Sequence, residues 1–168
     1  LGEFHIDYAR SVYRTLVTMN MCVDTTGRSS DWTGYKVLVV PILDLVDDAL
    51  AEKIKAFVAG GGTLVWFPFS GVRDEEANGF AGRRHPLLNE VFGTDIRECA
   101  SYGINEEIPF SWSGRSYAGR AFCDLPVTDS ADAQATFENT WFAGTPAVTV
   151  NEYGEGRAVS IGTYTDMA

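Results

Sequence analysis

The feature of this sequence that most constrains its fold is a strand–helix–strand pattern between Tyr35 and Phe69. The unbroken apolar run Val37–Val40 is typical of a central strand that is buried on both faces. Apolar positions then recur at helical spacing over Asp47–Ala59, and Thr63–Phe67 is a second apolar run. Two strands joined by one helix within about thirty residues form a right-handed βαβ unit, so the pattern predicts a parallel sheet.

Both ends of this helix carry recognisable signals. Asp44, Asp47 and Asp48 stand where the free N–H groups of a helix start attract carboxylates. Gly60–Gly62 ends the helix, because glycine adopts left-handed geometry at little cost. The glycines follow a helix and have no Lys-Ser/Thr after them, so they do not predict a phosphate-binding loop.

The remaining elements of the first half are shorter. Residues Ala9–Val17 follow helical spacing, with Asp7 as the expected N-cap. We expect a short strand at Met21–Thr25. After the central unit, Leu87–Phe92 predicts a short helix stopped by Gly93, and residues 95–99 predict a strand.

The second half changes in character. Ala100–Ser113 is acidic and turn-rich and shows no clear periodicity. Further along, β-branched and aromatic residues cluster as they do in strands. The expected strands are Arg115–Val127, Ala135–Phe142, Ala147–Val150 and Arg157–Gly162. A parallel α/β part followed by an antiparallel β-rich C-terminal part is therefore expected, in a single domain of residues 1–168.

Composition limits the partners. The chain has 168 residues, and its 13 basic and 23 acidic residues give a net charge of −10. Such a surface repels phosphate groups, so we expect no nucleic acid and no membrane partner. No apolar run approaches the roughly 18 residues of a membrane span, and there is no signal-peptide pattern.

Cysteine and histidine usage predicts a chain without metal or cofactor. Cys22, Cys99 and Cys123 lie far apart, which favours reduced thiols and a cytoplasmic location. A structural zinc site needs four ligands, and the only histidines are His5 and His85.

The turn after Thr63–Phe67 is a place where α/β enzymes mount a nucleophile. It contains Ser70, but no glycine stands two residues before it, so the G-x-S-x-G pattern is absent. His85 is the only histidine downstream, and in a polar loop we expect it to be a solvated surface residue. A serine hydrolase or amidase that uses Ser70 and His85 remains an alternative.

Other polar and aromatic groups give weaker signals. The carboxylate pairs, such as Glu106-Glu107, are adjacent in polar loops and predict a solvated face instead of acid–base catalysis. Most aromatic residues are expected in the core. Trp112 or Trp141 could form the stacking platform of a carbohydrate-binding module, which is a further alternative.

The loop Ser70–Pro86 is unusually long for a connection in a compact domain. Loops of about seventeen residues are either functional or disordered. This one leaves the carboxyl end of a parallel strand, where α/β folds place binding surfaces. Its apolar and arginine side chains are suited to an interface with a neighbouring subunit. These candidate interface residues are Phe69, Val72, Arg73, Phe80, Arg83 and Arg84.

The residues quoted so far resemble a known family. PILDLVDDALAEKIKAFVAGGGTLV and the EYGEGRA turn are the most specific parts of a resemblance to the trimerisation domain of family 42 glycoside hydrolases, the bacterial β-galactosidases. The flanking pieces DYARSVYRTL and HPLLNEVFGTDIRE agree, so the resemblance covers nearly the whole chain.

The resemblance implies a flavodoxin-like three-layer α/β/α sandwich, similar to class I glutamine amidotransferases, without amidotransferase activity. The cysteine of those enzymes is missing from Pro68-Phe69-Ser70-Gly71. It also implies a homotrimeric parent enzyme that hydrolyses terminal β-D-galactosides with two glutamates of a TIM barrel, none of which matches a residue of this chain. The family's domain begins with a strand before its first helix, so we expect an excised fragment whose sheet lacks or exposes an edge.

Overall fold

The computed structural model describes residues 2–165 of the chain. Within this range, no helix is both long enough and apolar enough to cross a membrane. The elements in chain order are α1 (Gly2–Thr18), β1 (Val37–Val40), α2 (Asp48–Ala59), β2 (Thr63–Trp66), α3 (Pro86–Phe92), β3 (Thr94–Ser101), β4 (Ile108–Trp112), β5 (Arg115–Thr128), β6 (Asp132–Phe137), β7 (Pro146–Tyr153), β8 (Gly156–Ile161) and β9 (Thr163–Thr165).

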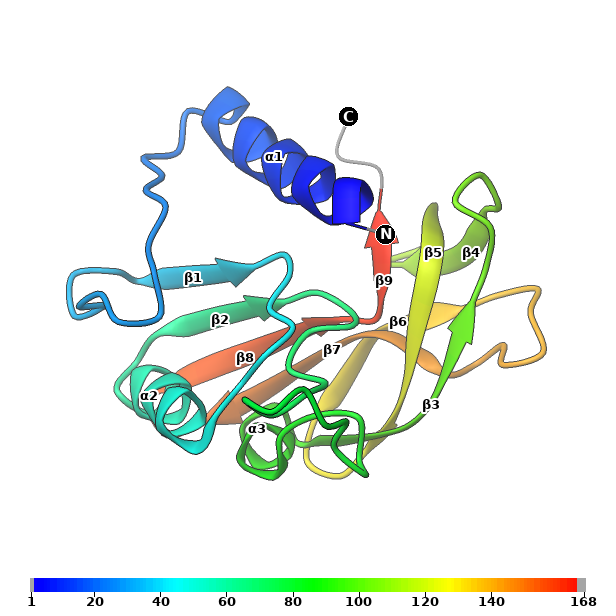
Figure 1. Cartoon of the computed structure of the whole chain (residues 1–168). Helices are drawn as coiled ribbons and strands as arrows, with labels where there is room; N and C mark the ends of the chain where they lie inside the picture. The colour runs from blue at the N-terminus through cyan, green and yellow to red at the C-terminus, as the bar shows by residue number, and fades with distance from the viewer. Residues whose placement is uncertain (1, 166–168) are drawn as a thin grey trace.

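The strands form one mixed sheet of nine strands (Figure 1). Its order is β1-β2-β8-β7-β6-β4-β5-β3, and β9 pairs with β5. β1, β2 and β8 are parallel, whereas the pairs formed by the later strands are antiparallel. The predicted βαβ unit is confirmed, because β1 and β2 are adjacent and parallel from Val37↔Thr63 to Val40↔Trp66. The antiparallel C-terminal part is confirmed as well.

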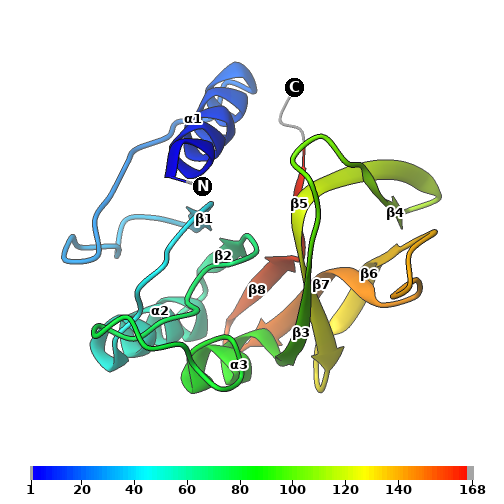
Figure 2. The same ribbon diagram turned by 45° about the vertical axis from the view of Figure 1, so that its right-hand side comes forward.

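Helices cover both faces of the parallel strands (Figures 1 and 2). Side chains alternate across a strand, so neighbouring residues of β2 reach different cores. Leu64 packs with α2 and α3 on one face, and Val65 packs with Tyr8 and Val12 of α1 on the other. The α2 start is as predicted, since Asp47 is the N-cap and its Oδ1 accepts a 2.8 Å hydrogen bond from the Leu50 N–H.

The antiparallel strands enclose a core of their own. Its members are apolar residues of β3 to β7 and of the turn after β6. The buried residues are Ala100, Ile108, Phe110, Cys123, Leu125, Ala135, Phe137, Phe142, Ala147 and Val148. Partly buried residues of β8, Val159 and Ile161, pack against this core, so β8 connects the two parts of the sheet.

The β7–β8 hairpin rests on the end of α2. The Glu155 N–H donates to the Ala59 carbonyl at 2.9 Å, and the Arg157 N–H donates to the Gly62 carbonyl at 3.2 Å. A Cβ at Gly156 would lie 2.2 Å from the Val58 carbonyl oxygen. The hairpin therefore requires glycine here to reach the helix backbone, which explains the EYGEGRA pattern.

β1 is at the edge of the described sheet, and the prediction that it is a central strand buried on both faces was wrong. Its even-numbered residues face β2, since the Lys36 and Val40 carbonyls accept bonds from Thr63 and Phe67. In a parallel ladder this leaves the backbone groups of Val37 and Val39 pointing outward. Beyond this edge lies a cavity of about 300 Å³, lined by β1, by apolar residues of α1 and by residues 21–26.

Four other boundaries differ from the predictions. Met21–Thr25 forms no strand, because it has no ladder partner in the described part of the chain. Asp7 lies inside α1, where it pairs with Arg10, and is not the cap. Residues 100–113 contain the whole of β4 although they show no periodicity. β6 ends at Phe137, and the residues that follow form a turn.

Candidate functional site

The turn after β2 is held by side chains from distant strands. Phe69 has φ of 59°, a left-handed conformation that costs a non-glycine residue about 1–2 kcal/mol. Its N–H donates to Asp124 Oδ2 at 3.1 Å. The Tyr164 hydroxyl donates to the Pro68 carbonyl at 2.9 Å. The strained position of this elbow thus belongs to Phe69, which has no nucleophilic group, and not to Ser70.

The carboxylate behind the elbow is in a desolvated setting. Burial raises the pKa of Asp124, while the bond from the Phe69 N–H and the positive charge of Arg84 oppose this rise. Burial also lowers the pKa of Arg84 to about 10, against the charges of Asp124 and Asp95. Arg84 therefore stays protonated at neutral pH, and its charge favours the ionised form of the half-buried Asp124 carboxylate.

Ser70 and His85 do not form a catalytic pair. Ser70 is buried, and its Oγ accepts a 3.2 Å hydrogen bond from the Leu43 N–H. His85 Nδ1 accepts from the Leu87 N–H at 3.3 Å, and Nε2 lies 2.9 Å from Asp48 Oδ1. Since both ring nitrogens are occupied, neither is free to take a proton from Ser70.

The expectation that His85 is a solvated surface residue was wrong. Its side chain is the N-cap of α3, and the residue is only 5% exposed. Pro86 occupies the first turn of that helix, where proline is favoured because its missing N–H has no partner there. A polar residue directly before a proline is the sequence signal for this cap.

The long loop is hydrogen-bonded to the rest of the chain. The Val46 N–H donates to the Arg73 carbonyl at 2.9 Å, and the Phe80 N–H donates to the Val72 carbonyl at 3.0 Å. Arg73 is exposed and pairs with Asp44 at 3.4 Å. Val72 and Phe80 are half-buried, and the Phe80 ring meets the edge of the His85 ring at 5.1 Å. The loop thus presents a defined surface.

Arg83 and Arg84 are neighbours in sequence but have different environments. Arg84 is buried, and its guanidinium donates to Asn89 and to Thr94 and lies 4.5 Å from the Phe92 ring centroid. We therefore exclude Arg84 from the candidate interface residues, because it serves the interior. Arg83 is half-buried with φ of 54°, and its Nε has no hydrogen-bond partner among the described residues.

An acidic hollow lies between the loop and the start of α2. Its volume is about 380 Å³, and Phe80 and His85 contribute to its lining. The carboxylates around it are Asp47, Asp48, Asp74, Glu75 and Glu76. Arg28 pairs with Asp47 at its border, and the Leu50 N–H and Arg28 hold the pKa of Asp47 below its usual value.

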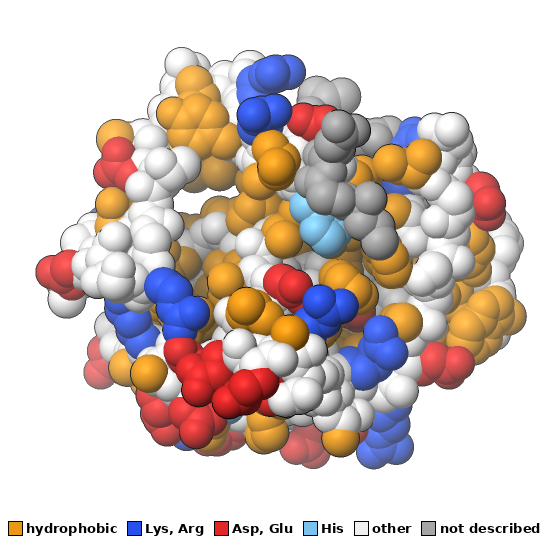
Figure 3. Space-filling model, in the orientation of Figure 1, with side chains coloured by type: hydrophobic (Ala, Val, Ile, Leu, Met, Phe, Trp, Pro, Cys, Tyr) orange, Lys and Arg blue, Asp and Glu red, His pale blue; other side chains and the backbone are white. Residues whose placement is uncertain are grey.

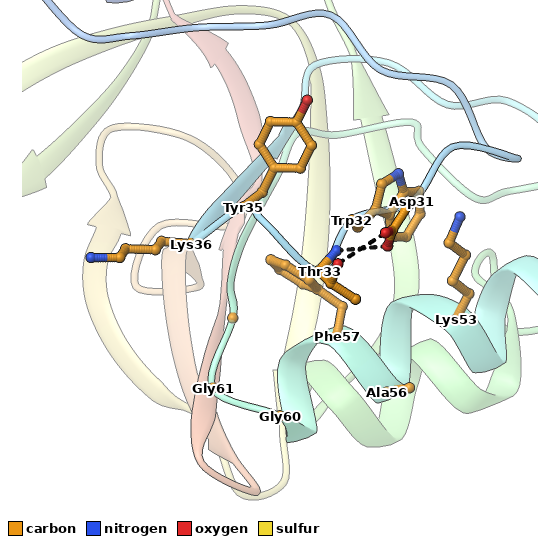
Figure 4. Close-up of a pocket in the computed structure, with 11 residues that line it drawn as sticks. Asp31, Trp32, Thr33, Tyr35, Lys36, Lys53, Ala56, Phe57, Gly60 and Gly61 are labelled. Carbon is orange, nitrogen blue, oxygen red and sulfur yellow. Dashed lines mark hydrogen bonds between the residues drawn. The ribbon is translucent and has the colours of Figure 1, made fainter.

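A larger pocket of about 520 Å³ lies between the polar loop before β1 and the end of α2 (Figure 4). Lys53 Nζ lies 3.9 Å from the centroid of the Trp32 ring and donates to the Arg28 carbonyl at 2.7 Å. The Asp31 carboxylate accepts two 3.0 Å bonds from Thr33, which lower the pKa of Asp31. The contacts of Lys53 attach the loop to α2, and no local sequence pattern indicates them.

The two tryptophans of the carbohydrate-binding alternative are both exposed. Trp112 ends β4 and lies 6.5 Å from the Tyr117 ring. Trp141 lies in the turn after β6, with its ring 5.0 Å from and perpendicular to that of Phe142.

Comparison with known proteins gives one consistent family. Residues 5–168 match the family described as "Beta-galactosidase trimerisation domain". β-Galactosidase bgaB of Geobacillus kaustophilus is 34% identical over 162 residues, which are 96% of this chain and 24% of that protein. GanA of Bacillus subtilis is 33% identical over 150 residues, 89% of this chain and 22% of that protein. The chain thus spans about a quarter of the length of these relatives.

Solved structures agree. The β-galactosidase from Bacillus circulans sp. alkalophilus superposes with a TM-score of 0.89 at 26% identity, over 97% of this chain and 25% of that chain. Gan42B, described as a GH42 β-galactosidase, superposes with a TM-score of 0.88 at 32% identity, over 94% of this chain and 23% of that chain.

Proposed function

The chain belongs to the family of β-galactosidase trimerisation domains, and we propose that it is the non-catalytic oligomerisation domain of a larger β-galactosidase. That enzyme would hydrolyse terminal β-D-galactosides as a homotrimer, with its catalytic glutamates on a TIM barrel outside residues 1–168. The observation that carries this proposal is the family match over residues 5–168, in a chain that spans about a quarter of its relatives.

The geometry of the elbow supports a non-catalytic role. Phe69 occupies the strained position at which a nucleophile would be exposed, and Asp124 and Tyr164 hold its backbone. Ser70 and His85 are each committed to hydrogen bonds that stabilise the fold. In a serine hydrolase, His85 would have to give up one of these hydrogen bonds before it could accept a proton from Ser70.

Replacement of Ser70 and His85 distinguishes a non-catalytic oligomerisation domain from a serine hydrolase. We expect Ser70→Ala and His85→Ala in the full-length enzyme to leave kcat on a galactoside within a few-fold of the wild type, because neither group touches the reacting atoms. His85→Asn is the matched control, since asparagine preserves a helix cap. A loss of about a thousandfold or more in kcat would favour the hydrolase alternative, provided that the variant has the same thermal unfolding midpoint as the wild type.

We place the subunit contact at the long loop. Phe69, Val72, Phe80 and Arg83 are half-buried in the isolated domain, and Arg73 is exposed. Half-buried aromatic and arginine side chains are the types that dominate interface energies. The loop would face a neighbouring subunit or that subunit's barrel, where it could form a wall of the galactoside pocket.

The loop variant Phe80→Ala combined with Arg73→Glu tests this contact. Loss of an apolar anchor and reversal of a charge should shift the full-length protein from trimer toward monomer in sedimentation velocity. Arg115→Glu, an exposed arginine on β5, serves as the control that keeps the trimer. An unchanged trimer with unchanged galactosidase activity would contradict this role for the loop.

We also propose that the parallel part is an amidotransferase-like, flavodoxin-like three-layer sandwich whose sheet is completed in the intact protein. The outward backbone groups of Val37 and Val39 and the adjoining cavity of about 300 Å³ support this. An extended strand in this cavity would pair with β1 and lie under the apolar residues of α1.

Amide hydrogen exchange tests whether an added strand pairs with the outer edge of β1. The Val37 and Val39 amides should exchange much more slowly in the full-length protein than in residues 1–168 alone, because the added strand would accept their hydrogen bonds. The Leu38 amide, which faces β2, is the internal control. Equally fast exchange of both outward amides in the full-length protein would rule the strand out.

A cytoplasmic location is also proposed. It rests on Cys22, Cys99 and Cys123, which are all free thiols in the structure. Cell fractionation checks it, and recovery of the enzyme mainly outside the cell would contradict it.

A further inference from the structure

The outward face of α1 carries apolar side chains that the rest of the described chain leaves uncovered. Ile6, Tyr13 and Val17 are 56%, 45% and 45% exposed. Their spacing of seven and four residues puts them on one side of the helix, and the opposite side buries Tyr8 and Val12. A helix with a second apolar side is typical of a helix packed on both sides in the complete protein.

This face forms a groove with a basic border. The groove has a volume of about 660 Å³ and is lined by Arg10 and Arg14 as well as by the apolar side chains. Arg10 is paired only at the surface, 3.2 Å from Asp7, and both of these side chains are 71% exposed. Two arginines beside apolar residues are notable in a chain of net charge −10. The groove is suited to an acidic partner with an apolar centre.

The chain itself carries a surface of that kind. The acidic hollow combines the exposed carboxylates of Glu75 and Glu76 with the ring of Phe80, all on the long loop. In Figure 3 a dense group of acidic side chains lies at the lower left, and α1 lies at the top with basic and apolar side chains. The two surfaces are on different sides of the sheet, since α1 covers one face and α2, which borders the hollow, covers the other. One copy therefore cannot bring them together, but two copies can.

The symmetry of a trimer requires two different surfaces. A self-complementary patch joins copies two at a time, so a closed ring of three must join unlike surfaces head to tail. We propose that the α1 groove of one copy binds the acidic loop of the next copy, with Arg10 and Arg14 facing Glu75 and Glu76. This inference rests on the proposed oligomerisation function and adds the second half of the contact to the loop.

Charge reversal on each side, followed by their combination, tests the pairing in the full-length protein. The first variant is Arg10→Glu with Arg14→Glu, and the second is Glu75→Arg with Glu76→Arg. Each variant alone places like charges together and should raise the dissociation constant of the trimer at least about tenfold in sedimentation velocity. The combined variant restores opposite charges and should recover most of the association. Arg115→Glu with Arg157→Glu is the matched control, and it should leave the trimer intact.

The outcomes separate this inference from the proposed function. A wild-type protein that sediments as a monomer would contradict the oligomerisation function itself. A wild-type trimer that neither reversal weakens would overturn only the pairing. Reversals that dissociate the trimer without rescue in the combined variant would also overturn it, since α1 would then face another part of the protein. Thermal unfolding of every variant, with midpoints close to the wild type, shows that the domain remains folded.

Discussion

The rest of the structure depends on the position of β8. It pairs in parallel with β2 over four residues, from Thr63↔Arg157 to Trp66↔Ser160, and antiparallel with β7 on its other side. This one strand converts a small βαβ unit and a curled antiparallel part into a single sheet. The close approach of the β7–β8 hairpin to α2 fixes the register of β8. A side chain at position 156 would clash with the Val58 carbonyl, so only glycine fits there.

The sequence predicted the elements whose signals are local. The βαβ unit, the Asp47 cap and the helix stop at Gly93 were correct, because each depends on residues within one turn or one strand. Features that depend on distant partners were missed. β4 is defined by its pairing with β5 and β6, and α1 extends to its first residues because Phe4 and Tyr8 pack against Tyr164.

In the candidate site, too, local features were predicted and features that depend on distant partners were missed. The long loop was identified from its length alone, but burial within it could not be derived from residue polarity. The sequence pattern predicted Arg84 at a subunit interface and His85 on the solvated surface. In the structure, the charge of Arg84 opposes that of Asp124 in the interior, and His85 caps α3. The elbow residue of interest was Phe69, whose left-handed backbone depends on Asp124, a residue 55 positions away.

Our central proposal is that residues 1–168 supply association and that the chemistry belongs to the rest of a larger β-galactosidase. The most direct measurement is the solution mass, by light scattering, of the full-length enzyme and of the same enzyme with residues 1–168 deleted. Cooperative unfolding of the deleted protein confirms that its remaining part is folded. The account predicts a trimer for the full-length enzyme and a monomer for the folded, deleted one. A deleted protein that still forms the trimer would contradict the claim.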